Sequence, residues 1–511
     1  MKKTAFIFSL MFITTFLSSC SSKVDPWEGM VKEKGINLHT YVYDREKDST
    51  IDVYIEGYES GYSLGIFDKD SEPGSAKGAI RRKPIKNDIY VYSFEIKDLK
   101  KSGDYNLFLF DKNLDIVCDY EVVTILDDDE NDYGVSSASI NVTNNGLINS
   151  EITINTTHLE ELTYYLYWAK DNVRLEDYTY IETFTSKDLD EIVIKLNDAM
   201  FAPEMANQIE VFVENGRSSS YFFNIPETLK VNESTYLTSL QISSDTHIES
   251  KYTCKNYNSH FLSNLNAVKN YEHESEGLVF VGDTANTGNK NNYDLFYEYI
   301  DSVFETRPTL YPIVGNHELQ YFTVYEDAIN TYKENTGMPG AYFTFELGGF
   351  KCFALGSEDV STHGVMSVNQ LNWFKDEISK LDKDEKIMIF MHQGIYNTVS
   401  GTLEGHGWHG LNTKNNGIRD VIKQYKNAFV FSGHSHQDLN CVQTSLFGNG
   451  NDANYVNCGS SAYVLNDNRE QVYGSTFYFV DVYEDYLILK GRLSIENKWI
   501  SAAQFVIPFV K

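Results

Sequence analysis

The sequence predicts a multidomain protein, with two N-terminal antiparallel β-sandwiches followed by a layered α/β domain. Its 511 residues suggest about three domains, at roughly 150 residues each. Up to about residue 230, short runs alternate apolar and polar residues with a period of two, which is typical of half-buried strands. After residue 234, apolar strands alternate with helical segments, which is typical of a layered α/β fold.

The composition excludes two broad classes of protein. Hydrophobic residues make up 42% of the chain, which is enough apolar surface to exclude a disordered polypeptide. The 43 basic and 73 acidic residues give a formal net charge of -30. Such a chain repels polyphosphates, so we expect no binding of a nucleic-acid backbone. A small phosphate ester can still bind where a bound cation makes the local electrostatic potential positive.

The first 20 residues have the pattern of a secretory signal. Two lysines precede the apolar stretch 5–16, and Leu-Ser-Ser-Cys at 17–20 ends it with small residues and a cysteine. This tetrapeptide resembles a bacterial lipobox, which implies a signal peptide at 1–19 and a lipidated tether at 20–26, with the lipid on Cys20. We therefore expect export and anchoring to a bacterial cell-envelope membrane. The alternative is an ordinary cleaved signal with an unmodified thiol.

Five cysteines remain once Cys20 is assigned to the lipid, and none of them forms a C-x-x-C motif. The odd count predicts neither a disulfide framework nor a thiolate zinc site. Cys352 lies in an apolar run and is expected in the core. Whether Cys441 and Cys458 pair depends on whether adjacent strands bring them together, which the sequence leaves open.

Residues 27–126 are expected to form the first β-sandwich, of the immunoglobulin or fibronectin type III kind. Ile51, Val53 and Ile55 occupy alternate positions, and clusters of Gly, Asn, Asp and Ser separate the strands. The acidic run at 127–134 interrupts this pattern. It lacks the glycine and the terminal glutamate of an EF-hand calcium loop, so we interpret it as a solvated linker.

Residues 135–230 are expected to form a second sandwich of the same kind. Its clearest signal is a pair of aromatic and β-branched runs, 209–213 and 221–225, around the turn dipeptide Asn215-Gly216. The aromatic residues within 164–168 allow two interpretations, a packed core or a face that binds carbohydrate or protein. The packed core is favoured, because it is the more frequent arrangement. The sandwich fold alone does not identify a function.

Residues 236–511 are expected to form the α/β domain. Its clearest helix places Leu371, Phe374, Ile378 and Leu381 on one face at helical spacing. Functional residues are expected beyond the carboxyl ends of the strands in such a fold. Apolar strands are predicted at 236–242, 278–281, 310–314, 387–391 and 429–431.

Five short motifs follow those strands. They are Asp245-Thr246-His247, Gly282-Asp283, Gly315-Asn316-His317-Glu318, His392, and Gly433-His434-Ser435-His436. Any one of them is more often a cap or a satisfied polar residue than a ligand. In this order and combination they resemble the signature of the calcineurin-like metallophosphoesterase superfamily, over about residues 236–511.

The resemblance implies two divalent metal ions. Mixed carboxylate, amide and imidazole ligands suit manganese, iron or zinc better than calcium or magnesium. Two such ions can activate a bridging water and stabilise the charge that develops during displacement at phosphorus. The implied ligands are Asp245, His247 and His436 for one ion, Asn316, His392 and His434 for the other, and Asp283 as a bridge.

The same resemblance assigns roles beyond the metal ligands. His317 would donate a proton to the leaving oxygen or stabilise the transition state, with a structural histidine as the alternative. Glu318 would orient His317. The glycine-rich loop 405–410 contains His406, Trp408 and His409, and a substrate-contacting rim and a plain exposed or packed loop explain it equally well.

Some segments resemble the purple acid phosphatase branch, namely 341–355, the helix at 370–374 and an N-terminal sandwich. That branch has glycine where this chain has His247, and a tyrosine ligand where Asn286 stands. The 5′-nucleotidase branch has Phe-Asp where Leu319 and Gln320 stand. These departures keep the resemblance at the level of the superfamily.

The predicted function is that of an exported dinuclear-metal phosphoesterase, which hydrolyses phosphomonoesters or phosphodiesters by attack of a metal-bound hydroxide. The alternative is a cell-surface lipoprotein that binds a ligand or glycan and uses the phosphoesterase fold without turnover. The expected partners are a phosphate-ester substrate and a membrane. The sequence predicts neither the exact substrate nor the oligomeric state.

Overall fold

A computed structural model describes residues 32–511, except 33, 39–41, 46–47, 59, 70–77, 102, 119, 127–134, 143–149, 157–161, 187–190, 197–198, 214–219, 227–228, 230, 251–255 and 407–416. The chain divides into two compact units, one of residues 1–132 with 214–218 and one of residues 133–213 with 219–511. The predicted signal peptide, the lipidated tether and the acidic linker lie outside the described residues.

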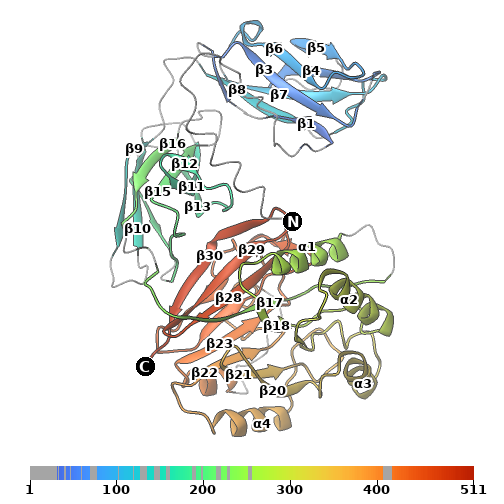
Figure 1. The fold of residues 1–511 in the computed structure, drawn as a ribbon, viewed down its shortest axis with the longest axis vertical. Coiled ribbons are helices and arrows are strands. Elements are labelled where there is room, and N and C mark those ends of the chain that lie inside the picture. The colour runs from blue at the N-terminus through green and yellow to red at the C-terminus, as the bar shows by residue number, and fades with distance from the viewer. Residues whose placement is uncertain are drawn as a thin grey trace. The chain divides into compact units, whose positions relative to one another are not determined.

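The first unit consists of two β-sheets (Figure 1). Alternation with a period of two decides which side chains form its core, since Ile51, Val53 and Ile55 are buried on one face of β3. One sheet has the order β1-β3-β6 and the other β2-β8-β7-β4-β5, with a 3-10 helix at Ile96–Asp98. The strands are β1 Gly35–Asn37, β2 Val42–Asp44, β3 Thr50–Glu56, β4 Ser63–Asp68, β5 Arg81–Pro84, β6 Val91–Glu95, β7 Gly103–Phe110 and β8 Glu121–Leu126.

The second unit begins with another all-β region. Its sheets have the orders β14-β10-β9 and β12-β11-β15-β16, and β13 pairs with β11. The predicted hairpin is present as the antiparallel pair β15–β16. The strands are β9 Val135–Val142, β10 Ser150–Thr156, β11 Leu162–Lys170, β12 Val173–Arg174, β13 Glu182–Ser186, β14 Glu191–Lys195, β15 Gln208–Val213 and β16 Ser220–Asn224.

Strand alternation decides between the two interpretations of the aromatic run in β11. Tyr164 and Trp168 are buried in the core between the two sheets, as favoured. Tyr165 and Tyr167 point to the opposite face and are half-buried. Both all-β regions therefore have the mostly β-sheet architecture that the sequence predicts, while their immunoglobulin-like topology stays a prediction.

The C-terminal domain has two six-stranded sheets with one apolar core between them. Their orders are β19-β18-β17-β28-β29-β30 and β20-β21-β22-β23-β25-β24, and a short pair, β26–β27, stands apart. The strands are β17 Tyr236–Ser243, β18 Ser275–Phe280, β19 Leu310–Pro312, β20 Tyr342–Leu347, β21 Phe350–Leu355, β22 Lys386–Phe390, β23 Asn427–Ser432, β24 Ser445–Leu446, β25 Asn454–Asn457, β26 Val464–Leu465, β27 Gln471–Val472, β28 Thr476–Tyr483, β29 Tyr486–Leu493 and β30 Lys498–Pro508.

Helices cover the outer faces of both sheets, which gives the predicted layered α/β fold. Apolar side chains of α1 (Tyr257–Lys269) and α2 (Lys290–Val303) pack on β18 and β28. Those of α4 (Val368–Ile378) and α5 (Ile418–Ile422) pack on β22 and β23. A further helix, α3, spans Tyr325–Thr336. In the predicted amphipathic helix, Phe374 and Ile378 are buried as expected, whereas Leu381 lies beyond the end of α4.

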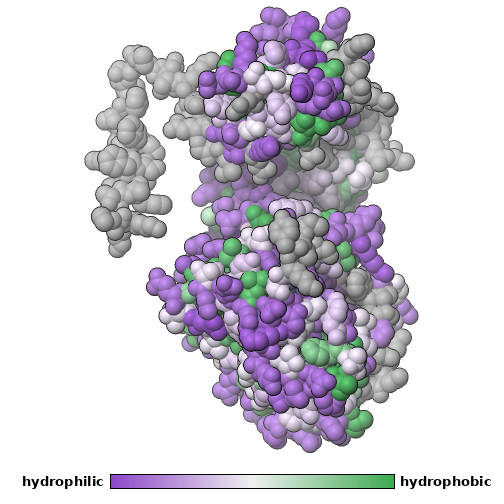
Figure 2. All heavy atoms as spheres, turned by 90° about the vertical axis from the view of Figure 1, so that its right-hand side faces the viewer, coloured by the Kyte–Doolittle hydropathy of each residue, from purple (hydrophilic) through white to green (hydrophobic). Residues whose placement is uncertain are grey.

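Cys352 is buried in the core, as predicted. Cys441 and Cys458 are both free thiols, so the pairing that the sequence left open is not formed. None of the helices in the described ranges is long and apolar enough to cross a bilayer. On the face seen in Figure 2, hydrophilic side chains predominate and hydrophobic ones are scattered, as expected for a chain with 23% charged residues.

Candidate metal centre

The five motifs meet because the strands before them end together. In one sheet, β17, β18 and β19 run parallel, and Asp245, Asp283 and Asn316 follow their carboxyl ends. In the other sheet, β22 and β23 also run parallel, and His392 and the 433–436 motif follow them. The two sheets share one core, so these loops converge at one edge of the domain.

Five of the predicted ligands have a left-handed backbone. Their φ angles are +52° for Asp245, +46° for His247, +51° for Asp283, +68° for His434 and +52° for His436. This conformation costs a non-glycine residue on the order of 1 kcal/mol or more, and it persists only where the surroundings enforce it. The backbone therefore accepts strain at the positions where the side chains converge.

Two glycines of the motifs allow neighbouring loops to approach each other closely. A Cβ atom on Gly433 would lie 1.8 Å from Ser244 Oγ, and one on Gly282 would lie 2.4 Å from His392 Nδ1. Neither distance is possible for non-bonded atoms, so any side chain at these positions would push a loop away from the cluster.

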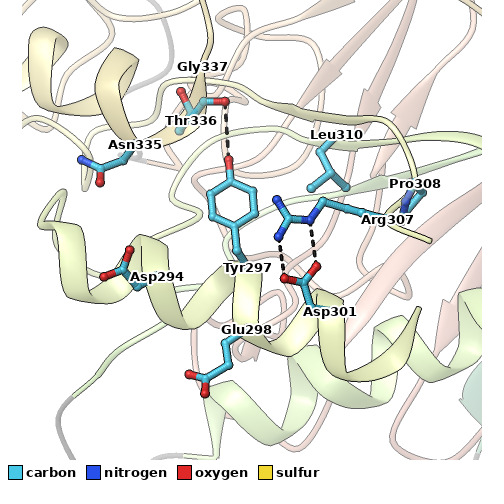
Figure 3. Close-up of a pocket in the computed structure, with 10 residues that line it drawn as sticks. All are labelled: Asp294, Tyr297, Glu298, Asp301, Arg307, Pro308, Leu310, Asn335, Thr336 and Gly337. Atoms are coloured by element: carbon cyan, nitrogen blue, oxygen red, sulfur yellow. Dashed lines mark hydrogen bonds and ion pairs between the residues drawn. The ribbon is translucent and has the colours of Figure 1, made fainter. Parts of the chain in front are cut away.

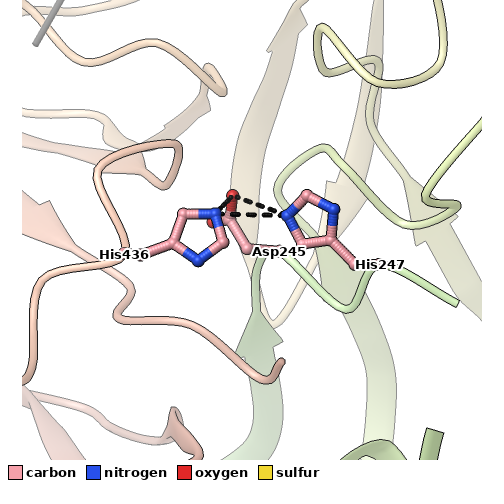
Figure 4. A group of neighbouring side chains, drawn as sticks. All are labelled: Asp245, His247 and His436. Carbon is pink, nitrogen blue, oxygen red and sulfur yellow. Dashed lines mark hydrogen bonds and ion pairs between the residues drawn. The ribbon is translucent and has the colours of Figure 1, made fainter. Parts of the chain in front are cut away.

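One cluster contains Asp245, His247 and His436, all buried (Figure 4). His436 Nε2 lies 3.1 Å from Asp245 Oδ1 and 3.1 Å from His247 Nε2. His247 Nε2 lies 3.9 Å from Asp245 Oδ1. The three ligand atoms thus face one common point.

A second cluster contains Asp283, His392 and His434. His392 Nε2 lies 3.1 Å from Asp283 Oδ2 and 3.1 Å from Asn316 Oδ1, which adds the predicted amide ligand. Asp283 Oδ2 also lies 3.9 Å from His247 Nε2 in the first cluster. Asp283 is therefore placed between the two groups, as a bridging carboxylate would be.

The protonation pattern shows that this donor set suits cations. The Nδ1 atoms of His392 and His436 lie 2.8 and 3.2 Å from the carbonyl oxygens of Val281 and Tyr463. Carbonyls only accept hydrogen bonds, so each Nδ1 carries a proton and each Nε2 is the ring atom that faces its cluster. There it meets carboxylate and amide oxygens, which are also acceptors. Imidazole nitrogens and oxygens that converge in this way form the donor set of a divalent metal ion, which would displace a proton from a facing nitrogen.

The electrostatics of the clusters are those of a site that attracts positive charge. Burial raises the pKa of Asp245, but the imidazoles of His436 and His392 outweigh it and bring the pKa below its usual range. Burial, with the neighbouring His436, lowers the pKa of His247 to about 3. Burial, with His392, does the same for His434, whose pKa is about 3. Burial lowers the pKa of His392, but Asp283 and Asp245 outweigh it and raise the pKa to about 10, so a cation that binds here would displace a proton from this ring.

His317 stands at the edge of the clusters. Its side chain is 22% exposed, and its Nε2 lies 4.0 Å from Asp283 Oδ2. Its ring is perpendicular to that of His247, with 4.4 Å between centroids, and the exposed Tyr321 lies on another side. The imidazole is thus close to both clusters and still open to solvent.

Comparison with known proteins gives one family match. Residues 241–438 match the family model described as calcineurin-like phosphoesterase. The chain carries a calcineurin-like phosphoesterase domain. The superfamily inferred from the motifs is confirmed, and the protein is a hydrolase that acts on phosphoester bonds. No curated protein matches the chain.

Solved structures give distant likenesses. A purple acid phosphatase from yellow lupin (Lupinus luteus) seeds is 12% identical, with 92% of this chain and 95% of that chain covered and a TM-score of 0.42. Phosphopantetheinyl hydrolase from Mycobacterium tuberculosis is 14% identical, with 44% and 91% covered and a TM-score of 0.29. A predicted phosphoesterase from Streptococcus pneumoniae is 11% identical, with 53% and 97% covered and a TM-score of 0.26. At these TM-scores the likenesses carry no argument about function.

Glu318 contacts the backbone of the phosphoesterase loops. Its buried carboxylate accepts hydrogen bonds from the backbone N–H groups of Asp283 at 2.9 Å, Ala285 at 3.0 Å and Gly315 at 2.8 Å. Burial and the charge of Asp283 raise its pKa to about 7, against the effect of these hydrogen bonds. His317 Nδ1 is held by the carbonyl of Asn286. The expected role of Glu318 in orienting His317 is therefore indirect, through the loop that it ties together.

The predicted rim loop is only partly described. His406 accepts a hydrogen bond from the backbone N–H of Gly401 through its Nδ1, at 3.2 Å. Trp408 and His409 lie outside the described residues. A substrate-contacting role for this loop stays a prediction.

A surface depression of about 740 Å³ lies elsewhere in the phosphoesterase domain, beside α2 (Figure 3). Its one arginine, Arg307, donates two hydrogen bonds to Asp301 at 2.8 and 2.6 Å, so its charge is already paired. None of the predicted ligands is among the described residues that line it. This depression is therefore separate from the metal centre.

Motif reasoning did not find the residues that hold the ligands in place. Ser460 Oγ lies 3.0 Å from His436 Nδ1, and the ring of Tyr463 stacks on that of His436 with 4.2 Å between centroids. Both residues come from a loop far along the chain, with no local pattern that indicates a site. Asn286 had one signal, because it occupies the position of the tyrosine ligand in the purple acid phosphatase branch.

Proposed function

We propose that the protein hydrolyses phosphomonoesters or phosphodiesters and that two divalent transition-metal ions, of manganese, iron or zinc, serve as its cofactors. The observation that carries this proposal is the position of Asp283, whose Oδ2 lies 3.1 Å from His392 Nε2 and 3.9 Å from His247 Nε2, between two groups of convergent lone pairs. Each group has its own set of possible ligand atoms, so a single ion would leave one set unused.

Each side chain would have a defined task. Asp245, His247 and His436 would hold one ion, Asn316, His392 and His434 the other, and Asp283 both. Bound ions would supply an activated water and bind the phosphoryl oxygens. Their charge would also let a phosphate ester approach a chain of net charge -30.

His317 would protonate the leaving oxygen. Its Nδ1 lies 2.8 Å from the carbonyl of Asn286, so Nδ1 keeps a proton and Nε2 is the atom that exchanges one with the substrate. Its partial exposure leaves room for a leaving group, which a buried ligand would not have.

Export and a lipid on Cys20 are part of the proposal. They are supported by the two lysines, the apolar stretch and the Leu-Ser-Ser-Cys sequence at the N-terminus. Replacing Cys20 with serine should release the protein from the membrane fraction. A Cys20→Ser variant that is cleaved normally and stays with membranes would contradict the anchor.

The test of activity is a panel of phosphomonoesters and phosphodiesters, assayed with the metal-free protein after addition of manganese, iron or zinc. We expect turnover of at least one ester class with at least one of these ions. Folded protein that binds the ions and hydrolyses none of the esters would favour the alternative, a binding lipoprotein without turnover.

A further inference from the structure

We propose that Asn286 is a positioning residue that sets the ring orientation and tautomer of two histidines at once, the ligand His247 and the proton donor His317. The roles of these two histidines, as metal ligand and as proton donor, rest on the proposed function. The geometry stands by itself: Asn286 Oδ1 lies 3.3 Å from His247 Nδ1, and the Asn286 carbonyl oxygen lies 2.8 Å from His317 Nδ1.

The backbone brings Asn286 to this place by extending the sheet. Beyond the ends of β17 and β18, the two chains remain paired through the backbone hydrogen bonds His247 N–H to Asp283 O at 2.9 Å and Ile248 N–H to Thr284 O at 3.0 Å. Asn286 N–H then donates to Ile248 O at 2.9 Å and closes the ladder. Asn286 is thus fixed by its own backbone before its side chain makes any contact.

The side-chain contact selects the tautomer of His247. The Nε2 of this ring faces His436 Nε2 and the carboxylates of Asp245 and Asp283, so it must present a lone pair for a cation to bind. The proton then resides on Nδ1, where the amide oxygen of Asn286 accepts it. An imidazole ligand whose other nitrogen is held in this way is pre-oriented for its metal.

The backbone contact does the same for His317. A carbonyl oxygen can only accept, so the Nδ1 of His317 keeps its proton and its Nε2 is left for the substrate. The two rings stand perpendicular at 4.4 Å, and one residue fixes the angle of both. Asn286 therefore holds the metal ligand through its side chain and the proton donor through its backbone.

The position also explains a departure from the purple acid phosphatase pattern. In this chain the amide oxygen contacts the outer nitrogen of a ligand, on the side away from the clustered Nε2 and carboxylate atoms. Asn286 therefore supports a metal ligand at the place where that branch has a ligand itself.

The test compares three variants: Asn286→Leu, which removes the acceptor at similar size, Asn286→Asp, which keeps an acceptor oxygen, and Asn291→Leu as a matched control. Asn291 is exposed in the first turn of α2, five residues further along the chain. Each protein is stripped with a chelator and titrated calorimetrically with Mn²⁺, after circular dichroism has verified folding.

We expect Asn286→Leu to weaken one Mn²⁺ site by about tenfold or more, the usual effect of losing the partner of an imidazole ligand. Asn286→Asp and Asn291→Leu should stay within about threefold of the unaltered protein, which is smaller than that effect. The ratio of turnover for nitrophenyl and alkyl phosphates at saturating Mn²⁺ should be unchanged in Asn286→Leu, because the backbone carbonyl still holds His317.

Two results would overturn the proposal. Unaltered Mn²⁺ affinity in Asn286→Leu would show that the side chain does not position His247. Equal weakening in the Leu and Asp variants would show that the loop, and not the acceptor oxygen, supports the site. Failure of the unaltered protein to bind Mn²⁺ would be a different result, since it would contradict the proposed function itself.

Discussion

The first β-sheet unit and the phosphoesterase domain bury different kinds of side chain. The described core of the first unit is almost entirely aliphatic and aromatic, and its buried polar residues are Asn37, Ser63 and Thr124. The phosphoesterase domain buries Asp245, Asp283 and several histidines at one edge. A buried charge costs several kcal/mol unless it is paired, so a region that only has to pack avoids one.

The backbone shows the same difference. Among the described residues of the first unit, the non-glycine residues with positive φ are Asp88 and Leu114, both in loops between strands. In the phosphoesterase domain, five of the predicted ligands have positive φ although they are buried or half-buried. The other non-glycine residues with positive φ that the structure describes in this domain lie in exposed turns and loops, namely Asn397, Gln443, Asn449, Arg469 and Asn497. Strain and buried charge coincide at that edge of the domain, so a chemical role explains it better than packing does.

Removing the bridging charge should have the largest effect. Asp283→Asn keeps the size of the side chain but weakens both clusters, because one carboxylate serves both. We expect turnover to fall by about a thousandfold or more, together with loss of bound metal, which a phosphate-ester assay and elemental analysis would measure. A variant with near-normal turnover would show that Asp283 is not shared.

An apolar truncation in the first unit should affect stability alone. Ile51 is fully buried, and Ile51→Ala should lower the free energy of unfolding of that unit by about 3 kcal/mol. Denaturant unfolding measures this change. Turnover per folded molecule should be unaltered, since this core shares no residue with the metal clusters. A large loss of turnover would show that the first unit contributes to catalysis as well as to stability.

His317→Ala should reduce turnover by about a hundredfold, while the metal content stays near that of the unaltered protein. The loss should be smaller for nitrophenyl esters than for alkyl esters, because an acidic leaving group needs little protonation. Steady-state rates for the two ester types measure this. An equal loss for both would contradict proton donation, and a loss of metal would make His317 a ligand.

The smallest effect is expected at the surface of the phosphoesterase domain. Arg307 pairs with Asp301, and both side chains are largely exposed. Arg307→Ala should change the free energy of unfolding by less than about 1 kcal/mol, the usual limit for an exposed pair, and should leave turnover unaltered. Thermal unfolding and the ester assay test this. A marked loss of turnover would give the depression in Figure 3 a role in catalysis.

The sequence predicted the convergence of the ligands, because each motif places them directly after an apolar strand. Parallel strands bring such positions to one edge, so order and spacing suffice for Asp245, His392 and His436. What holds these side chains could not be predicted. Carbonyl partners such as those of Val281 and Tyr463 depend on backbone conformation and not on residue type. The end of α4 before Leu381 was not predicted either, because apolar spacing places helix ends only to within a few residues.

The central claim is a site for two metal ions that share Asp283. Elemental analysis of the purified protein, loaded with manganese, iron or zinc and then freed of loosely bound ions, tests this claim most directly. We expect about two ions per chain in the unaltered protein and a marked loss of bound metal in Asp283→Asn. One ion or none in the unaltered protein, or two ions retained in Asp283→Asn, would contradict it.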